Sequence, residues 1–172
     1  MAGSTPSPSP QILIVLVAGI GDLILASKGI RALRKGHPGA FIHILTSSEA
    51  APIAVSYPYI DAVHAFPIRE LRNDKRVILT ILRIVRDLRK KDFDKLLNLY
   101  RVTSFTGAMK MGSLFSLLRA KTKIGHDRYG FGCFLSQRVS AETFEGIHIV
   151  KAMHEITLTA GGIADDRGIE VF

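Results

Sequence analysis

Apolar residues along the chain fall into short continuous runs that alternate with segments in which they recur at helical spacing. The runs of strand length are bounded by turn residues and cover 12–17, 40–46, 61–67, 94–100 and 121–127. The segments with helical spacing cover 22–35, 48–57, 75–90, 103–118 and 148–160. Because strands alternate with helices, we expect an α/β fold, a Rossmann-like parallel sheet with helices on both faces.

The expected elements form one domain over residues 12–163, with no internal repeat. Serine and proline dominate residues 1–11, which we expect to be a disordered lead-in without the apolar core of a secretion signal. Polar residues indicate where helices begin: Ser48 caps the second helix and Thr103 or Ser104 caps the fourth. No apolar run reaches the roughly 18 residues that a membrane span needs.

The 172 residues carry a formal net charge of +8 and a single cysteine, Cys133. One cysteine allows no internal disulfide and fits a reducing compartment, and we expect Cys133 to be a small apolar residue near the core. The positive charge indicates an anionic partner, which could be nucleic acid, a phosphorylated glycan or an acidic membrane surface.

Basic residues are concentrated at Arg83–Lys91, within the third expected helix. That helix has an apolar stripe, and Arg83, Arg86 and Lys90 face away from it. The stripe consists of Val77, Ile81, Ile84, Val85 and Leu88. A solvated helix face is the favoured interpretation, and a membrane-surface patch is the alternative.

Polar residues follow each expected strand, at the end where parallel sheets bind their ligands. In chain order they are Gly19, Gly21 and Asp22; Thr46, Ser47 and Glu49; Arg69 and Arg72; Tyr100, Arg101, Thr103 and Ser104; and His126, Asp127 and Arg128. We expect all of them at one rim of the sheet. The Asp-x-Asp pair of Asp92 and Asp94 precedes a strand, so it should lie at the opposite rim. We predict no metal there, and none at His148 and His154, whose spacing places them on different helix faces.

The turn after the first strand reads Gly-Ile-Gly-Asp, over Gly19–Asp22. A dinucleotide fingerprint would have a third glycine where Ile24 stands, and its acidic ribose partner would have to be Glu49. Asp22 would also repel a phosphate at the helix N-terminus. As a single residue, Asp22 is best interpreted as a helix cap. Together with two glycines, it suggests a fixed carboxylate, kept ionised by the helix dipole, that can accept a proton from a substrate hydroxyl.

Several motifs in order carry a resemblance to a known family. They are the opening strand with its Gly-Asp turn, the Tyr57–Val63 segment YPYIDAV, the Phe93–Leu99 strand FDKLLNL, the Ile124–Arg128 segment IGHDR and the His148–Lys151 segment HIVK. From about Ile12 to Ile163 the chain resembles glycosyltransferase family 9, the lipopolysaccharide heptosyltransferases. It departs from the family pattern at Leu16, after the fourth strand and in the last helix, which leaves the acceptor sugar open.

The resemblance implies the N-terminal, acceptor-binding half of a GT-B enzyme that inverts the anomeric centre without a metal. It places the general base on Asp22, in the manner of inverting glycoside chemistry. It implies acceptor contacts at the turn glycines and at rim residues, with arginines for acceptor phosphates. These are Gly19, Gly21, Arg69, Arg101, Thr103 and Arg128.

The resemblance further implies that residues 164–172 begin an interdomain linker and that a C-terminal domain, which binds the ADP-heptose donor, is missing. The 172-residue chain alone should then lack transferase activity and bind no cofactor. Its partners would be a phosphorylated glycolipid and the inner face of the cytoplasmic membrane, with no nucleic acid, at a cytoplasmic, peripheral location.

Two other functions remain open from the sequence. One is a stand-alone nucleotide or dinucleotide-binding module that holds phosphate at the Gly19–Gly21 turn. The other is a non-catalytic module that binds acidic partners through the Arg83–Lys91 face.

Overall fold

A computed structural model of the protein describes residues 9–72, 74–127, 130–140, 149–164 and 166–169. Its elements, in chain order, are β1 (Gln11–Leu16), α1 (Ile20–Gly36), β2 (Phe41–Ser47), α2 (Ala51–Val55), β3 (Ala62–Phe66), the 3₁₀ turn η1 (Glu70–Arg72), α3 (Val77–Arg89), β4 (Phe93–Asn98), α4 (Phe105–Leu117), β5 (Ala120–Asp127), β6 (Gln137–Ser140) and α5 (Ile149–Thr159). The alternation of strands and helices expected from the hydrophobic pattern is confirmed.

The strands form one sheet in the order β3-β2-β1-β4-β5-β6, and every neighbouring pair is parallel. Strands β1, β2 and β3 follow one another outward in one half of the sheet. The chain then crosses back to place β4 beside β1, and β5 and β6 extend the other half. The strand order therefore reverses between β1 and β4, and the carboxyl ends of these two strands form the switch point at which such sheets bind ligands.

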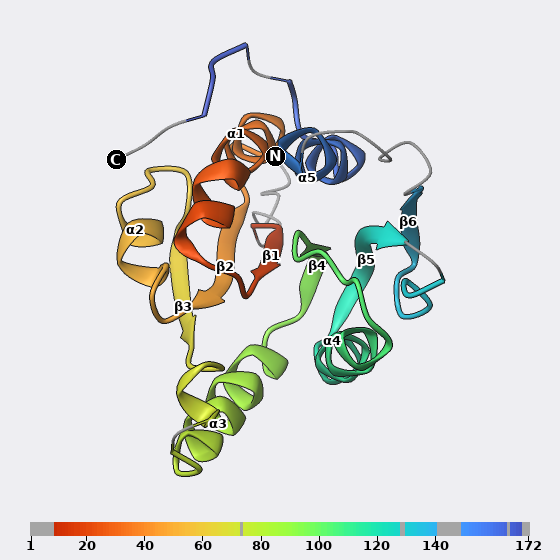
Figure 1. The fold of residues 1–172 in the computed structure, drawn as a ribbon. Coiled ribbons are helices and arrows are strands. Elements are labelled where there is room, and N and C mark those ends of the chain that lie inside the picture. The colour runs from red at the N-terminus through yellow and green to blue at the C-terminus, as the bar shows by residue number, and fades with distance from the viewer. Residues whose placement is uncertain (1–8, 73, 128–129, 141–148, 165, 170–172) are drawn as a thin grey trace, which may run out of the picture.

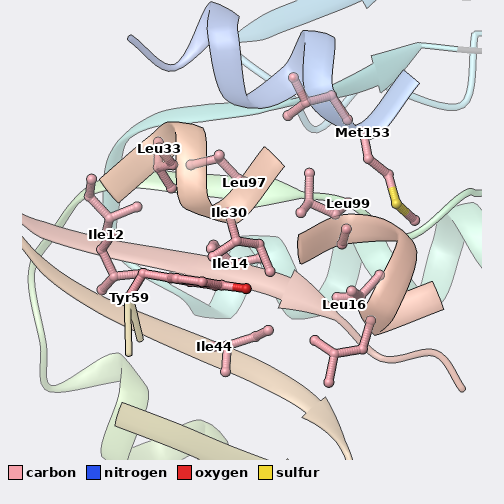
Figure 2. Close-up of a cluster of buried hydrophobic side chains, with 14 of the residues drawn as sticks. Ile12, Ile14, Leu16, Ile30, Leu33, Ile44, Tyr59, Leu97, Leu99 and Met153 are labelled. Carbon is pink, nitrogen blue, oxygen red and sulfur yellow. The ribbon is translucent and has the colours of Figure 1, made fainter. Parts of the chain in front are cut away.

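Helices cover both faces of the sheet, as the sequence predicts (Figure 1). The side chains of β1 alternate between the faces because successive residues of a strand point in opposite directions. Ile12, Ile14 and Leu16 join a core with α1, α2 and α5, part of which Figure 2 shows. Leu13 and Val15 join a second core with α3 and α4.

Helices α1 and α5 lie side by side on the first face (Figure 1). Their close contact depends on a glycine, since a Cβ added at Gly29 would lie 3.1 Å from Oγ1 of Thr157. After α5 the chain runs back along α1. The Ile163 amide donates to the carbonyl oxygen of Ala32, and the buried Arg31 donates to the carbonyl oxygens of Arg167 and Gly168.

Some local expectations are wrong. Ser48 does not cap α2, whose N-cap position is Ala50. Cys133 is exposed rather than near the core, because its neighbours Phe134 and Leu135 take the inward-facing positions. Strand β6 is absent from the predicted elements because it is short and polar. Ser104 caps α4, as predicted, by accepting a hydrogen bond from the Gly107 amide at 3.1 Å. Of the lead-in expected over residues 1–11, residues 1–8 lie outside the described residues, whereas Gln11 already belongs to β1.

Candidate functional site

The turn between β1 and α1 is held in place by a serine from the neighbouring strand. Ser47, at the end of β2, donates a hydrogen bond from its hydroxyl to the carbonyl oxygen of Ala18 at 2.7 Å. The Ala18 amide in turn donates to the carbonyl oxygen of Leu16 at 2.9 Å. The chain is therefore fixed immediately before Gly19, so that the first turn of α1 has a defined position above the sheet.

Asp22 is the third residue of α1 and does not cap it. The N-cap position is Gly19, whose extended backbone has no side chain to offer, and α1 has no side-chain cap. The cap interpretation of Asp22 is therefore wrong. An acidic residue in the first turn still interacts favourably with the helix dipole. The Asp22 side chain is half-buried, and among the described residues no cation forms an ion pair with it.

A pocket of about 340 Å³ lies beside Asp22 at the switch point between β1 and β4. Its polar wall comes from Asp22, Tyr100 and Arg101. Its other lining residues are small or apolar and come from the ends of β1 and β4 and from α5; they are Leu16, Ala18, Leu99, Ile149 and Met153. Asp22 and Arg101 therefore place an acidic and a basic residue on the same pocket.

Neither glycine of the turn is required by contacts within the described part of the domain. A Cβ added at Gly21 would meet no atom within 4 Å, and one at Gly19 would lie 3.7 Å from Nη2 of Arg69, an ordinary contact. The glycines instead leave the backbone of the first helical turn open. Open amides at a helix N-terminus favour anionic or strongly polar ligands.

Arg69 lies beside this turn and is paired. Its guanidinium donates to the Glu49 carboxylate at 2.5 Å, and both side chains are largely exposed. The prediction that residues after β1, β2 and β3 meet at one rim is confirmed for Gly19, Glu49 and Arg69. An exposed pair of this kind contributes little to folding, so it can be exchanged for a ligand at small cost.

Other predicted rim residues have structural roles. Thr46 and Ser47 are buried within β2 rather than open to a ligand. His126 contacts the carbonyl oxygen of Ala152 at 3.0 Å, and Asp127 accepts from the Gly132 amide and from Arg138. These contacts hold α5 and the connection to β6 against β5.

One predicted residue contributes less than expected, and two cannot be placed. Thr103 is exposed and does not line the pocket. Arg128 and the side chain of Arg72 lie outside the described residues. By contrast, sequence reasoning missed Ile149 and Met153 as pocket residues, since helical periodicity indicated only that they belonged to an apolar face.

Asp94 lies at the amino end of β4, on the rim of the sheet opposite the pocket, as predicted. Its carboxylate accepts a hydrogen bond from the Gln11 amide at 2.8 Å and forms an ion pair with Lys121 at 2.7 Å. Among the described residues, no group of three or more histidine, cysteine or acidic side chains is arranged to hold a metal ion. Within the same residues, no helix is both long and apolar enough to cross a bilayer.

Comparisons with known proteins bear on the resemblance seen in the sequence. No family model matches the chain. The chain is 27% identical over 107 residues to lipopolysaccharide heptosyltransferase 3 of Escherichia coli, a match that covers 62% of this chain and 29% of that protein.

Solved structures agree in fold. Escherichia coli heptosyltransferase WaaC with ADP matches with a TM-score of 0.75 at 17% identity, over 92% of this chain and 49% of that one. A family 9 glycosyltransferase from Veillonella parvula matches with a TM-score of 0.71 at 17% identity, over 99% of this chain and 48% of that one. The predicted resemblance is confirmed as a similarity: the chain has the Rossmann-like fold found in these heptosyltransferase and family 9 glycosyltransferase structures, and it spans about half the length of these solved structures.

Proposed function

We propose that this chain is the N-terminal, acceptor-side half of an inverting, metal-independent heptosyltransferase-like enzyme of lipopolysaccharide core or related envelope glycan synthesis. The observation that carries the proposal is the position of Asp22. Its carboxylate borders a pocket at the switch point of the sheet, next to an open helix N-terminus and to Arg101. The curated relative is named a lipopolysaccharide heptosyltransferase, and this supports the choice of reaction.

In the proposed reaction the Asp22 carboxylate accepts the proton of an acceptor hydroxyl as that oxygen attacks the anomeric carbon of the donor sugar. A new glycosidic C–O bond forms while the bond to the nucleoside diphosphate breaks, and the diphosphate leaves with the electron pair. Attack from the face opposite the leaving group inverts the anomeric centre, as in inverting glycoside hydrolysis.

The acceptor is proposed to be a phosphorylated glycolipid, held at this rim by positive charge. Arg101 on the pocket and Arg69 beside Gly19 are the described arginines placed for acceptor phosphates. The proposed donor is ADP-heptose, bound by a C-terminal half that residues 164–172 would join to this one. One matching WaaC structure contains ADP-2-deoxy-2-fluoro heptose, which supports that class of donor. With such a lipid-linked acceptor, the proposed location is the cytoplasm, at the inner face of the cytoplasmic membrane.

The test uses the full-length parent protein and measures ADP release from ADP-heptose in the presence of acceptor. Asp22→Asn removes the base and keeps the size of the side chain, so we expect transfer to fall by roughly 10²-fold or more, with an unchanged melting temperature. Asp92→Asn is the matched control and should transfer normally, because Asp92 immediately precedes β4, on the rim of the sheet opposite the pocket. Near-normal transfer by Asp22→Asn would contradict the proposal, as would turnover by the 172-residue chain alone.

The strand order keeps one alternative open, since the same order occurs in dinucleotide-binding domains. A stand-alone nucleotide-binding module would bind ADP or NAD at the Gly19–Gly21 turn of the 172-residue chain. Titration calorimetry separates the two functions, because the acceptor-side half should bind neither nucleotide tightly. Tight binding that strengthens in Asp22→Asn would favour the module.

A further inference from the structure

Helix α3 exposes three large apolar side chains. Ile78 is 49% exposed, Leu79 68% and Leu82 56%, although α3 also contributes the buried Val85 and Leu88 to the core. The spacing of the exposed three places them on neighbouring positions of one helix flank. Figure 1 shows α3 at the edge of the molecule farthest from α1 and α5, projecting past the sheet. The predicted apolar stripe is confirmed at Val85 and Leu88, which are buried. The three exposed side chains extend the apolar surface of α3 beyond that stripe, toward solvent.

Basic side chains surround this apolar flank. Between residues 75 and 91 they are Lys75, Arg76, Arg83, Arg86, Arg89, Lys90 and Lys91. The only acidic residue in that range is Asp87, which lies 3.6 Å from Arg86 and 3.5 Å from Lys90. Within the described part of the chain, no ion pair engages Arg76, Arg83 or Arg89. The surface is therefore strongly cationic around an apolar centre.

We propose that α3 lies in the surface of an anionic lipid bilayer, with Ile78, Leu79 and Leu82 inserted between headgroups and the arginines on lipid phosphates. An interfacial helix combines these two features, a large apolar face and a basic polar face. Arginine side chains next to the apolar centre can extend toward the phosphates while their methylene stems stay among apolar groups. Each cation near an anionic surface adds to the attraction.

The composition of the flank argues against nucleic acid as the partner. Single-stranded nucleic acid is bound by cationic surfaces that also offer aromatic side chains for stacking. Helix α3 contains no aromatic residue, and its exposed apolar side chains are isoleucine and leucine. These residues gain from burial in lipid and offer no stacking surface to a base.

The chain order connects this surface to the candidate site. Arg69 is followed by η1 and then by α3, so the membrane-facing helix begins shortly after the rim arginine. A protein seated on α3 would hold that rim near the lipid headgroups, where the glycan of a lipid-linked acceptor begins. The inference deepens the proposed peripheral association and rests on that part of the proposed function.

The test measures co-sedimentation of the 172-residue chain with vesicles of phosphatidylcholine and phosphatidylglycerol, and with vesicles of phosphatidylcholine alone. We expect binding to the anionic vesicles that weakens as salt is raised. Ile78→Gln/Leu79→Gln/Leu82→Gln should weaken it by roughly tenfold or more. Arg83→Glu/Arg86→Glu/Arg89→Glu should weaken it by on the order of a hundredfold. All six side chains are exposed and glutamine and glutamate are good helix formers, so the fold should survive, as circular dichroism would verify.

Matched controls come from the opposite face of the sheet. Val55→Gln in α2 replaces an apolar residue that is 71% exposed, and Lys151→Glu in α5 reverses an exposed charge. Both should bind vesicles as the unmodified chain does. The inference is overturned if the chain ignores anionic vesicles, if the glutamine variant binds them as well as the unmodified chain, or if polyuridylate competes vesicles away through the same arginines. None of these results depends on Asp22→Asn, so this inference and the transferase proposal can fail separately.

Discussion

Asp22 and Arg101 line the same pocket, although they belong to opposite halves of the sheet. Asp22 follows β1, which leads into the half that contains β2 and β3. Arg101 follows β4, which leads into the half that contains β5 and β6. The reversal of strand order between β1 and β4 therefore brings a carboxylate and a cation from distant parts of the chain to one site.

This arrangement predicts unequal roles for two neighbouring residues after β4. In the full-length protein, Arg101→Gln should raise the KM for a phosphorylated acceptor by about tenfold, because a charge-assisted hydrogen bond is lost. Thr103→Ala is the matched control and should leave KM unchanged, since Thr103 is exposed and outside the pocket. Steady-state kinetics with ADP-heptose held saturating provides the measurement. Equal effects of the two changes would remove Arg101 from the acceptor site.

A second prediction concerns the ion pair between Arg69 and Glu49. If an acceptor phosphate takes the place of the Glu49 carboxylate, Glu49→Gln should lower the acceptor KM severalfold, whereas Arg69→Gln should raise it. The double variant should behave as Arg69→Gln does, because Glu49 acts only through Arg69. Thermal stability should change little in either single variant, since the pair is exposed. A fall in KM that persists in the double variant would refute the exchange.

Much of this site follows from reasoning on the sequence alone, and the misses have physical causes. The strands, their parallel arrangement and a ligand site at their carboxyl ends follow from hydrophobic periodicity and from the alternation of strands with helices. Periodicity does not show at which residue of a turn a helix begins. The sequence therefore favours Asp22 as the cap, whereas Gly19 occupies the N-cap position. Nor does it reveal β6, a short edge strand whose pairing depends on β5. Contacts between distant segments, such as that of Ser47 with Ala18, have no local signal.

Two glycines near the end of α1 differ in their surroundings and should differ in mutational cost. A Cβ at Gly36 would overlap the backbone carbonyl oxygen of Gly161, which cannot move aside as a flexible side chain would, whereas one at Gly39 would meet no atom within 4 Å. We expect Gly36→Ala to lower the free energy of unfolding by about 2 kcal/mol or more. Gly39→Ala should be neutral or slightly stabilising. Urea unfolding at neutral pH would check both, and similar stabilities would contradict the tight packing of α1 against the segment after α5.

The stability of the domain should also fall in mild acid because of two histidines in contact. His43 lies 3.1 Å from Nε2 of His64 through its Nδ1, and its Nε2 lies 3.0 Å from Oε1 of Gln11. Burial, followed by the neighbouring His64 and Lys91, lowers the pKa of His43 to about 4, against a weaker opposing effect of Asp61. Burial and Lys91 also lower the pKa of His64.

The unfolded chain protonates these histidines near their ordinary pKa of about 6.5, whereas the folded chain protonates His43 only near pH 4. The unfolded state therefore binds more protons between these values, and folding stability drops as the pH falls from about 6.5 toward 4. We expect His43 alone to account for about 1–2 kcal/mol of the loss between pH 7 and pH 5. Urea unfolding at both values should show a smaller pH dependence in His43→Gln, and an unaltered dependence in that variant would contradict the assignment.

Helix α1 connects two distant regions of the domain, the pocket and the segment after α5. Its first turn carries Asp22, and its second half holds the segment after α5 through Arg31, Ala32 and Lys35. A helix transmits displacement along its axis with little bending. A displacement of the segment after α5 would therefore shift the first turn of α1, which lines the pocket. The position of Asp22 at the pocket would then depend on how the segment after α5 sits against α1.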